Sequence, residues 1–417
     1  MNVFVRVAPL IILCFLISGC KKDHSDLPNA PSLHNPNNLN AQQKQIISAD
    51  QELALKLLEA LNPQQLQQNI FISPFSISMA LGMTLNSARA NTYDEIRQTL
   101  GFEGLKQEEI NQSYKNLMQQ LITFDNLVFM ELANAIFYRQ NFSVKRSFLD
   151  INAKYFNARI SPLDFALPAA VGTINQWASD HTHGKIEQIL TAIPAETVMY
   201  LLNAIYFKGT WVYRFDERFT NEQPFFPDST SKIPCDMMQI TQQLPYLERS
   251  RLQMIDLPYG NGHYVMTLIL PKYPLHVNTF IGQFNNQNIM NWFNQLSEDS
   301  VTLKFPKFKI QYDRSLKDVL MALGIRDAFH PQRANFTGIA NSGGLYISKV
   351  KHSTFIEVNE EGTEAAGATL VEFSKTSAEN SPKPFMLVNR PFLFIIRERS
   401  SNMVLFIGKI VRPQWSA

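Results

Sequence analysis

The segment Phe392-Leu393-Phe394-Ile395-Ile396 is followed by a polar stretch, Arg397 to Asn402, and then by a second apolar run, Met403 to Val411. Two apolar runs on either side of a short polar turn predict a β-hairpin. Because both runs are almost continuously apolar, each strand of the hairpin should be buried on both of its faces. We therefore expect antiparallel sheet in the core of the protein.

Helix and strand patterns alternate through the rest of the chain. Val301, Leu303 and Phe305 alternate with polar residues, which is typical of a strand with one buried face. Helical spacing recurs in Leu53-Leu57-Leu61 before Asn62-Pro63, and in Leu316-Val319-Leu320-Leu323 before Gly324. Helices and antiparallel strands in one chain predict the α+β class.

The N-terminus has the pattern of an export signal. Arg6 precedes an apolar run, Val7 to Ile17, that is too short to cross a membrane, and Ser18-Gly19-Cys20 follows it. This order predicts a signal peptide at residues 1–19 and resembles the site where bacterial lipoproteins are cut and lipidated on the cysteine. We expect Cys20 to anchor the exported protein to the bacterial cell envelope, on the periplasmic face or at the cell surface. An ordinary cleavage site with an incidental cysteine is the alternative.

Composition changes once more after the signal. Residues 20–45 are polar and rich in Asn, Pro and Gln, which predicts a flexible tether behind the lipidated cysteine. No second linker follows, so residues 46–417 should form a single domain, and 45% hydrophobic residues can supply a large core. With 38 basic and 36 acidic residues the charge is nearly balanced, which argues against a nucleic-acid partner.

Enzyme motifs are missing from the sequence. We find no Gly-x-Ser-x-Gly, Walker loop, Cys-x-x-Cys or His-Glu-x-x-His pattern. His181-Thr182-His183 is the best metal lead, but no carboxylate or cysteine stands nearby at ligand spacing, so we interpret it as the polar end of a helix before Gly184. Gly260-Asn261-Gly262 lies between two strand-like runs and predicts a hairpin turn. Cys235 would be the one cysteine left in the domain, which rules out an intramolecular disulfide. We expect no metal and no cofactor.

Several separated motifs resemble the serpin family, in family order, from about residue 48 to Pro413. They are Asn69-Ile70-Phe71-Ile72-Ser73-Pro74-Phe75-Ser76-Ile77, Ile174-Asn175-Gln176-Trp177, Thr182-His183-Gly184-Lys185-Ile186, Leu202-Asn203-Ala204-Ile205-Tyr206-Phe207-Lys208-Gly209-Thr210-Trp211, Asn389-Arg390-Pro391-Phe392 and Phe406-Ile407-Gly408-Lys409. The resemblance implies the serpin fold: three β-sheets with a large central sheet, about eight or nine helices around them, and an exposed reactive centre loop. Ser87 and Ala90 depart from the pattern, because many members carry glycine there.

The segment Glu360-Glu361-Gly362-Thr363-Glu364-Ala365-Ala366-Gly367-Ala368-Thr369 resembles the hinge of the reactive centre loop in inhibitory serpins. A loop that enters a sheet as a new strand must pass its inward side chains between packed strands, which requires small residues there. The alternate residues are all small: Thr363, Ala365, Gly367 and Thr369. No proline between Glu360 and Ser381 would interrupt a new hydrogen-bond ladder. Composition alone also fits an ordinary surface loop, but the position after the predicted strand Ser353 to Val358 favours a hinge, with a reactive centre loop at about 360–388.

The same resemblance places the bond that a protease would cut. Counting forward from Glu360 by the usual family spacing gives the bond from Thr376 to Ser377, whereas counting back from Asn389 gives Asn380. We prefer the forward count, because insertion depth depends on the hinge side while extra length on the far side costs little entropy. Thr376 would suit an elastase-like pocket, and Lys375 one residue earlier would suit a trypsin-like pocket. Cysteine proteases are a further class of target, which could cut elsewhere in this stretch.

The resemblance also implies two control regions in the central sheet. Ser73, Ser76, Asn203 and His352 would form the shutter, a buried polar cluster where the sheet opens. Trp211, Lys307 and Glu360 would form the breach, where an ion pair holds the hinge.

We predict a monomeric suicide inhibitor of serine proteases, which traps its target as a covalent acyl-enzyme after the loop is cut. It would bind the membrane only through its lipid. A serpin-fold binding or chaperone protein that never inserts its loop is the main alternative. A hydrolase would need a nucleophile beside a base, and the sequence shows neither.

Overall fold

The computed structural model describes residues 39–363 and 383–415. Its α-helices are α1 (Ala41–Leu61), α2 (Pro74–Leu85), α3 (Ala90–Thr99), α4 (Gln107–Thr123), α5 (Arg146–Phe156), α6 (Pro168–His181), α7 (Val277–Ile281), α8 (Asn286–Phe293) and α9 (Lys317–Ala322). Its strands are β1 (Ile70–Ile72), β2 (Val128–Arg139), β3 (Ala158–Leu163), β4 (Met199–Thr210), β5 (Asn221–Phe225), β6 (Ile233–Glu248), β7 (Leu252–Tyr259), β8 (Tyr264–Pro271), β9 (Ser297–Pro306), β10 (Phe308–Ser315), β11 (Lys351–Val358), β12 (Gly362–Thr363), β13 (Phe385–Leu387), β14 (Phe392–Glu398) and β15 (Val404–Ile410).

The predicted hairpin is confirmed as β14 and β15, which pair antiparallel from Phe392 opposite Ile410. Every residue of both strands is buried, as the continuous apolar runs predict. The two strands lie inside a sheet of nine strands, in the order β1-β15-β14-β8-β7-β6-β9-β13, with β5 paired to β6. The long strand β6 pairs with β9 along most of its length and with β7 at its end, so it joins two of the three expected sheets into one.

A second sheet of six strands runs in the order β10-β11-β12-β4-β2-β3. Its longest members are β2 and β4, which pair antiparallel from Val128 opposite Gly209 to Tyr138 opposite Met199. Strand β12 has only two residues and lies between β11 and β4 at one end of the sheet. The α+β class with a large central sheet is therefore confirmed.

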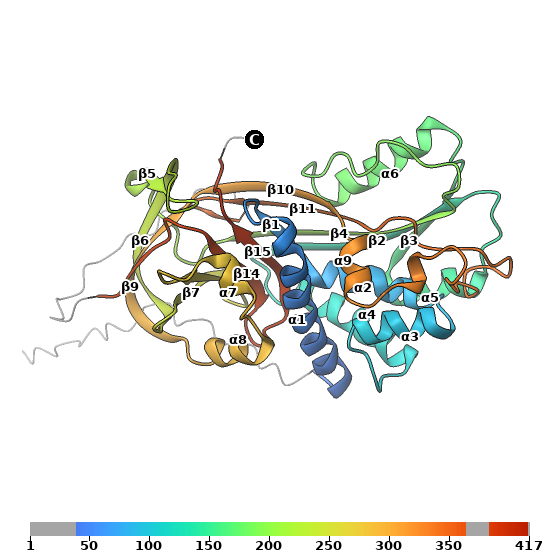
Figure 1. Cartoon of the computed structure of the whole chain (residues 1–417), viewed down its shortest axis with the longest axis horizontal. Coiled ribbons are helices and arrows are strands. Elements are labelled where there is room, and N and C mark those ends of the chain that lie inside the picture. The colour runs from blue at the N-terminus through green and yellow to red at the C-terminus, as the bar shows by residue number, and fades with distance from the viewer. Residues whose placement is uncertain (1–38, 364–382, 416–417) are drawn as a thin grey trace, which may run out of the picture.

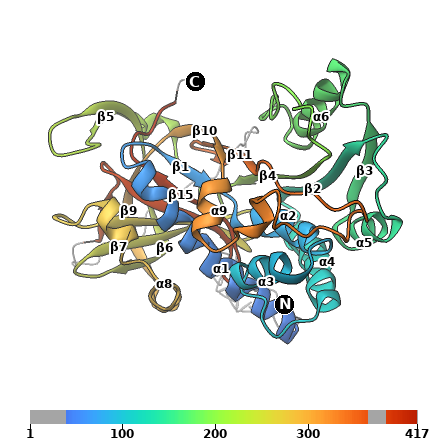
Figure 2. The ribbon, with the colours of Figure 1, turned by 45° about the vertical axis from the view of Figure 1, so that its right-hand side comes forward.

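Helices cover the six-stranded sheet unevenly (Figures 1 and 2). Helix α6 lies alone on one face, where Trp177 and Ile174 pack with Ala135 and Phe137 of β2 in a small separate core. On the other face, α2 packs against β4 and β15 within the main core, between the two sheets. Beside residues 199–204 of β4, a further strand would therefore lie between α6 on one side and α2 on the other.

The start of the domain differs from the prediction. Helix α1 begins at Ala41, before the expected boundary at Ile46, because Asn40 caps it. The Asn40 side chain accepts a hydrogen bond from the backbone N–H of Gln43, and the Gln43 side chain accepts one from the backbone N–H of Asn40. Asn40 and Gln43 therefore belong to the folded domain, although the composition around them is that of a tether.

Candidate functional site

Strand β12 places the start of the predicted hinge inside the central sheet. Gly362 lies opposite Thr210 of β4, while Thr363 lies opposite Gly209 of β4 and Val358 of β11. A Cβ atom on Gly362 would stand 2.1 Å from the carbonyl oxygen of Gly209, so only glycine fits there. The hinge residues Glu364 to Thr369, and the residues around the predicted cut, Lys375, Thr376 and Ser377, lie outside the described residues.

Thr363 faces the interior, as the predicted alternation requires, and is 2% exposed. Its hydroxyl lies 2.5 Å from the hydroxyl of Tyr259, and the Tyr259 ring stacks on Trp211 at 4.3 Å between centroids. The backbone N–H of Trp211 donates to the carbonyl of Glu361, and its indole N–H donates to the carbonyl of Asn359. The backbone and the side chain of Trp211 thus both hold the turn into the hinge.

Trp211, Lys307 and Glu360 come together at the same end of the sheet. The Glu360 carboxylate lies 3.0 Å from the ammonium group of Lys307 and accepts a 2.7 Å hydrogen bond from the hydroxyl of Thr220. The Glu360 carbonyl accepts from the backbone N–H of Phe215. Buried charges are stable only when they are paired in this way, so the contacts fix the chain just before β12.

Ser73, Ser76, Asn203 and His352 also form one neighbourhood, beneath the middle of the sheet. The backbone N–H of Ser73 donates to Nε2 of His352 at 3.1 Å, and the Ser76 hydroxyl donates to the side-chain carbonyl of Asn203. Ser73 caps α2 by accepting from the backbone N–H of Ser76. Buried polar groups are costly unless they are satisfied, and these contacts join α2, β4 and β11 at one point.

The His352 ring is neutral in this cluster. Burial lowers the pKa of His352 to about 4. Because Nε2 accepts the hydrogen bond from Ser73, the proton of the neutral ring lies on Nδ1.

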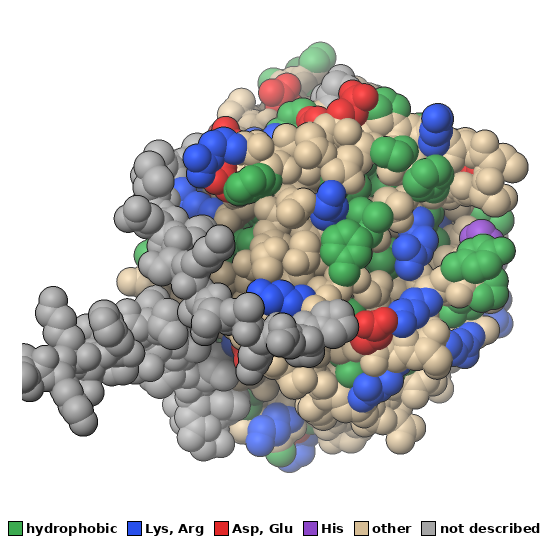
Figure 3. All heavy atoms as spheres, turned by 90° about the vertical axis from the view of Figure 1, so that its left-hand side faces the viewer, with side chains coloured by type: hydrophobic (Ala, Val, Ile, Leu, Met, Phe, Trp, Pro, Cys, Tyr) green, Lys and Arg blue, Asp and Glu red, His purple; other side chains and the backbone are tan. Residues whose placement is uncertain are grey.

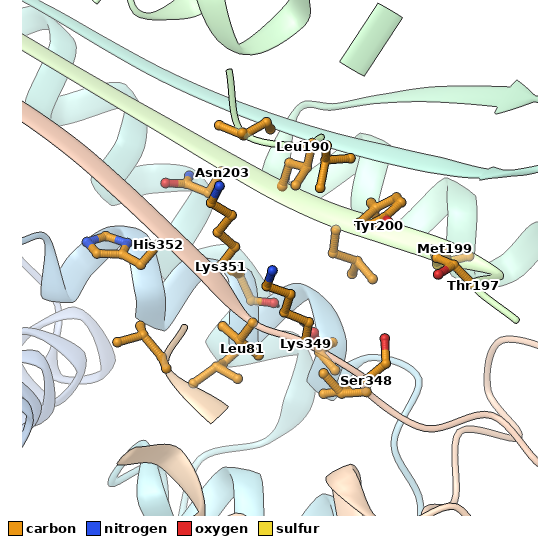
Figure 4. A pocket seen from close by; sticks show the side chains of 18 of the residues that line it. Leu81, Leu190, Thr197, Met199, Tyr200, Asn203, Ser348, Lys349, Lys351 and His352 are labelled. Atoms are coloured by element: carbon orange, nitrogen blue, oxygen red, sulfur yellow. Dashed lines mark hydrogen bonds between the residues drawn. The ribbon is translucent and has the colours of Figure 1, made fainter. Parts of the chain in front are cut away.

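A cavity of ≈ 220 Å³ separates β4 from residues 344–353, and we call it the strand gap. Asn203 and His352 stand on its opposite walls, and Lys349 and Lys351 also line the wall of His352 (Figure 4). The ammonium group of Lys351 lies 2.9 Å from the carboxylate of Asp313 on β10. Among the described residues, β12 is the only strand that pairs with β4 on this side. The edges of β4 and β11 therefore face each other across a space where one further strand could lie.

The two histidines of the rejected metal lead lie at the C-terminal end of α6, as interpreted. Nδ1 of His181 and Nε2 of His183 both contact the carboxylate of Glu131 on β2, a partner that sequence spacing could not reveal. Within residues 39–363 and 383–415, no group of three or more His, Cys, Asp or Glu side chains could hold a metal ion. Over the same residues, no helix is long and apolar enough to span a membrane.

The resemblance did not point to three further residues of the site. Asn134 on β2 links the polar cluster onward, accepting from Asn203 at 2.8 Å and donating to the carbonyl of Phe156. Tyr259 and Thr220 contact the hinge from strands and turns far away in the sequence. A buried asparagine in a mostly apolar strand, such as Asn134, is the one signal that the sequence carried.

A short hinge strand in a central sheet, an open gap beyond it and a polar cluster across that gap define the serpin class of protein. The chain belongs to the serpin family, since residues 48–413 match the family model described as Serpin (serine protease inhibitor).

Among curated relatives, the chain is 32% identical to leukocyte elastase inhibitor A of Mus musculus, over 89% of this chain and 100% of that protein. Among solved structures, it is similar to the native state of the thermophilic serpin tengpin, with 30% identity, a TM-score of 0.80, and 90% and 95% coverage. It is also similar to human thyroxine-binding globulin complexed with thyroxine, with 27% identity, a TM-score of 0.82, and 90% and 100% coverage.

Proposed function

We propose that this serpin is a suicide inhibitor of serine proteases, in which a cut reactive centre loop inserts into the strand gap. Serpins are mostly protease inhibitors rather than enzymes, and the name of the mouse relative describes an elastase inhibitor. The observation that carries the proposal is the register of β12, because it determines where each later residue of the loop would fall.

Continuing the register of β12 sets Ala365 opposite Phe207 of β4 and Ile356 of β11. Both of these side chains are buried, so the space for an inward side chain is small. The same continuation sets Thr369 between Asn203 and His352, the two polar walls of the strand gap. A threonine hydroxyl can donate and accept there, which matches the chemistry of the cluster.

Insertion would also release free energy. A strand of about a dozen residues adds a similar number of ladder hydrogen bonds, each worth roughly 0.5 to 1.5 kcal/mol. Their sum is comparable with the roughly 5 to 15 kcal/mol that stabilises a typical domain. The uncut protein is therefore metastable in this proposal. Cleavage at Thr376–Ser377, or after Lys375, frees the hinge to insert and carry the acylated protease with it.

The test is to mix the purified protein with trypsin and with an elastase, and to analyse the products on denaturing gels and by intact mass. A band at the summed mass of inhibitor and protease that survives SDS supports the covalent trap, and the mass of the released C-terminal peptide identifies the cut bond. A papain-like cysteine protease in a third reaction tests the further target class. Cleavage of the loop without any such band would contradict the proposal, and the chain would then be a binding protein, as thyroxine-binding globulin is.

The location is a separate proposal, since residues 1–38 lie outside the described residues. We propose that Cys20 is lipidated after removal of residues 1–19 and anchors the domain to the bacterial cell envelope. Arg6, the apolar run and Ser18-Gly19-Cys20 support it. Expression of wild type and Cys20→Ser in bacteria, with fractionation and labelling by a fatty acid, tests it. The wild type should be labelled and found in membranes, whereas equal labelling and distribution of both proteins would contradict it.

A further inference from the structure

The last described residues of the chain lie against the breach. After β15 the chain passes the buried Pro413, and the carbonyl of Gln414 accepts a 2.7 Å hydrogen bond from the backbone N–H of Lys309 at the start of β10. Strand β10 is the edge strand of the central sheet, so this bond attaches the tail to an otherwise open edge. Lys307 lies two residues earlier, in the link between β9 and β10.

Lys307 is held between two groups of different chemistry. Its ammonium group lies 3.0 Å from the Glu360 carboxylate and 4.4 Å from the centre of the Trp415 ring. The Glu360 side chain is 6% exposed and that of Lys307 is 17% exposed, whereas Trp415 is 38% exposed. Trp415 is thus the more exposed of the two partners of Lys307, and Glu360 is the more buried.

The position of Trp415 on the solvent side of Lys307 has two physical effects. An indole face attracts an ammonium group, and tryptophan is the strongest aromatic partner for one. A bulky ring beside the pair also keeps water away, which strengthens the attraction between the ammonium group and the carboxylate. Both effects favour the position in which Lys307 holds Glu360.

We propose that Trp415 is a positioning residue, which acts through Lys307 to hold Glu360 and so restrains the hinge. The effect on the hinge rests on the proposed function, because a restraint has a consequence only in a loop that can insert. The contact between Trp415 and Lys307 does not depend on it. Figure 3 shows that Lys and Arg side chains are spread over the end of the molecule that carries β5, β6 and β9, which adjoins the hinge through Thr220. Substitution of Lys307 therefore tests whether the effect of Trp415 depends on this lysine.

The test uses the full chain, uncut, with Trp415→Ala, Trp415→Phe, Lys307→Met and the double variant of Trp415→Ala with Lys307→Met. Urea unfolding should show that Trp415→Ala shifts the unfolding equilibrium about two- to fivefold, the range expected for an exposed cation–π contact. Trp415→Phe should recover most of the shift. In the Lys307→Met background, which keeps an apolar stem, Trp415→Ala should have no further effect. Tyr273→Ala, at an 87% exposed aromatic residue in a turn, controls for loss of a surface ring.

A second readout follows the hinge itself. Each uncut variant is held at mild heat, and its conversion to a heat-resistant form is followed on native gels. Trp415→Ala should convert about two- to fivefold faster than wild type if the whole contact energy restrains the hinge, and Trp415→Phe should convert at close to the wild-type rate. If no variant converts, the restraint on the hinge is overturned, while the unfolding cycle still reports the contact and the protease reactions above still test the proposed function. An equal cost of Trp415→Ala with and without Lys307→Met would show a packing role only and overturn the proposal.

Discussion

The ammonium group of Lys307 lies 3.0 Å from the carboxylate of Glu360, and both side chains are largely shielded from solvent. Thr220 holds the second oxygen of the same carboxylate. Removing one partner of a buried ion pair leaves an unpaired charge, which costs far more than losing a surface pair. The beginning of the hinge is therefore held by an ion pair, and a single substitution that changes the sign of one charge would turn its attraction into repulsion.

Glu360→Lys should release the hinge, because two ammonium groups would then meet in a shielded site. We expect the uncut variant to insert its loop prematurely or to form polymers during mild heating, which native gels would show as new bands. Glu357→Lys is the matched control, since Glu357 meets Lys309 at 3.9 Å in a more exposed pair. A Glu360→Lys protein that stays a stable monomer would contradict the prediction, as would equal behaviour of the two variants.

Ala365→Arg should turn the protein from an inhibitor into a substrate. The continued register sets this residue between Phe207 and Ile356 in the core, where an arginine cannot be accommodated. We expect cleavage of the loop at an unchanged rate and loss of nearly all SDS-stable complex on denaturing gels.

Glu364→Arg is the matched control for that experiment. The same register sets Glu364 opposite Lys208 and Glu357, which are only partly buried on the outer face. An arginine there should leave most of the complex intact. Loss of complex in both variants would argue against the inward and outward alternation, and loss in neither would argue against insertion.

Acid should destabilise the protein through His352. Burial holds the folded-state pKa of His352 at about 4, below the ordinary histidine value of about 6.5, so the unfolded chain binds the additional proton first as pH falls. The stability associated with neutral His352 is complete above about pH 6.5. It is lost progressively as pH falls toward 4, by about 3 kcal/mol in total.

Urea unfolding of wild type and His352→Gln between pH 4 and 7 measures this loss. The difference between the two proteins in unfolding free energy should shrink by about 3 kcal/mol as the pH falls, since glutamine does not titrate in this range. Other titrating groups affect both proteins alike and cancel in the difference. A difference that stays constant across the range would exclude His352 as the cause.

Local patterns in the sequence predicted most of the elements. The apolar runs of β14 and β15 and the glycine turn between β7 and β8 needed no long-range information, because periodicity and turn chemistry determine them. The domain boundary expected at residue 46 falls inside α1, since a run of Asn and Gln has the composition of a linker. Its reciprocal cap between Asn40 and Gln43 stabilises a helix that composition does not indicate.

The site was less predictable than the fold, because its contacts join distant parts of the chain. The resemblance implied one cluster of Ser73, Ser76, Asn203 and His352, and these residues lie together in the structure. Periodicity does not predict the hydrogen bond from Thr220 to Glu360 or the contacts of Glu131 with two histidines. These contacts depend on which distant strands and turns pack together. The strand gap itself is a space between two strand edges, so no single residue encodes it.

Ala90→Gly should stabilise the protein, at one of the two positions where the sequence departs from the family pattern. Ala90 has φ = 48°, in the left-handed region, which costs a residue with a Cβ roughly 1 to 2 kcal/mol. Glycine removes that strain, but it also gives the unfolded chain more conformational freedom, which offsets part of the stabilisation. We therefore expect the free energy of unfolding in urea to rise by up to about 1 kcal/mol. Ala90 is exposed, and no packing is lost with its methyl group. Ala153→Gly, at an exposed position within α5, is the matched control and should lower the free energy of unfolding by about 1 kcal/mol. If both substitutions destabilise alike, the left-handed backbone at Ala90 is not strained, and the glycine of other family members has another cause.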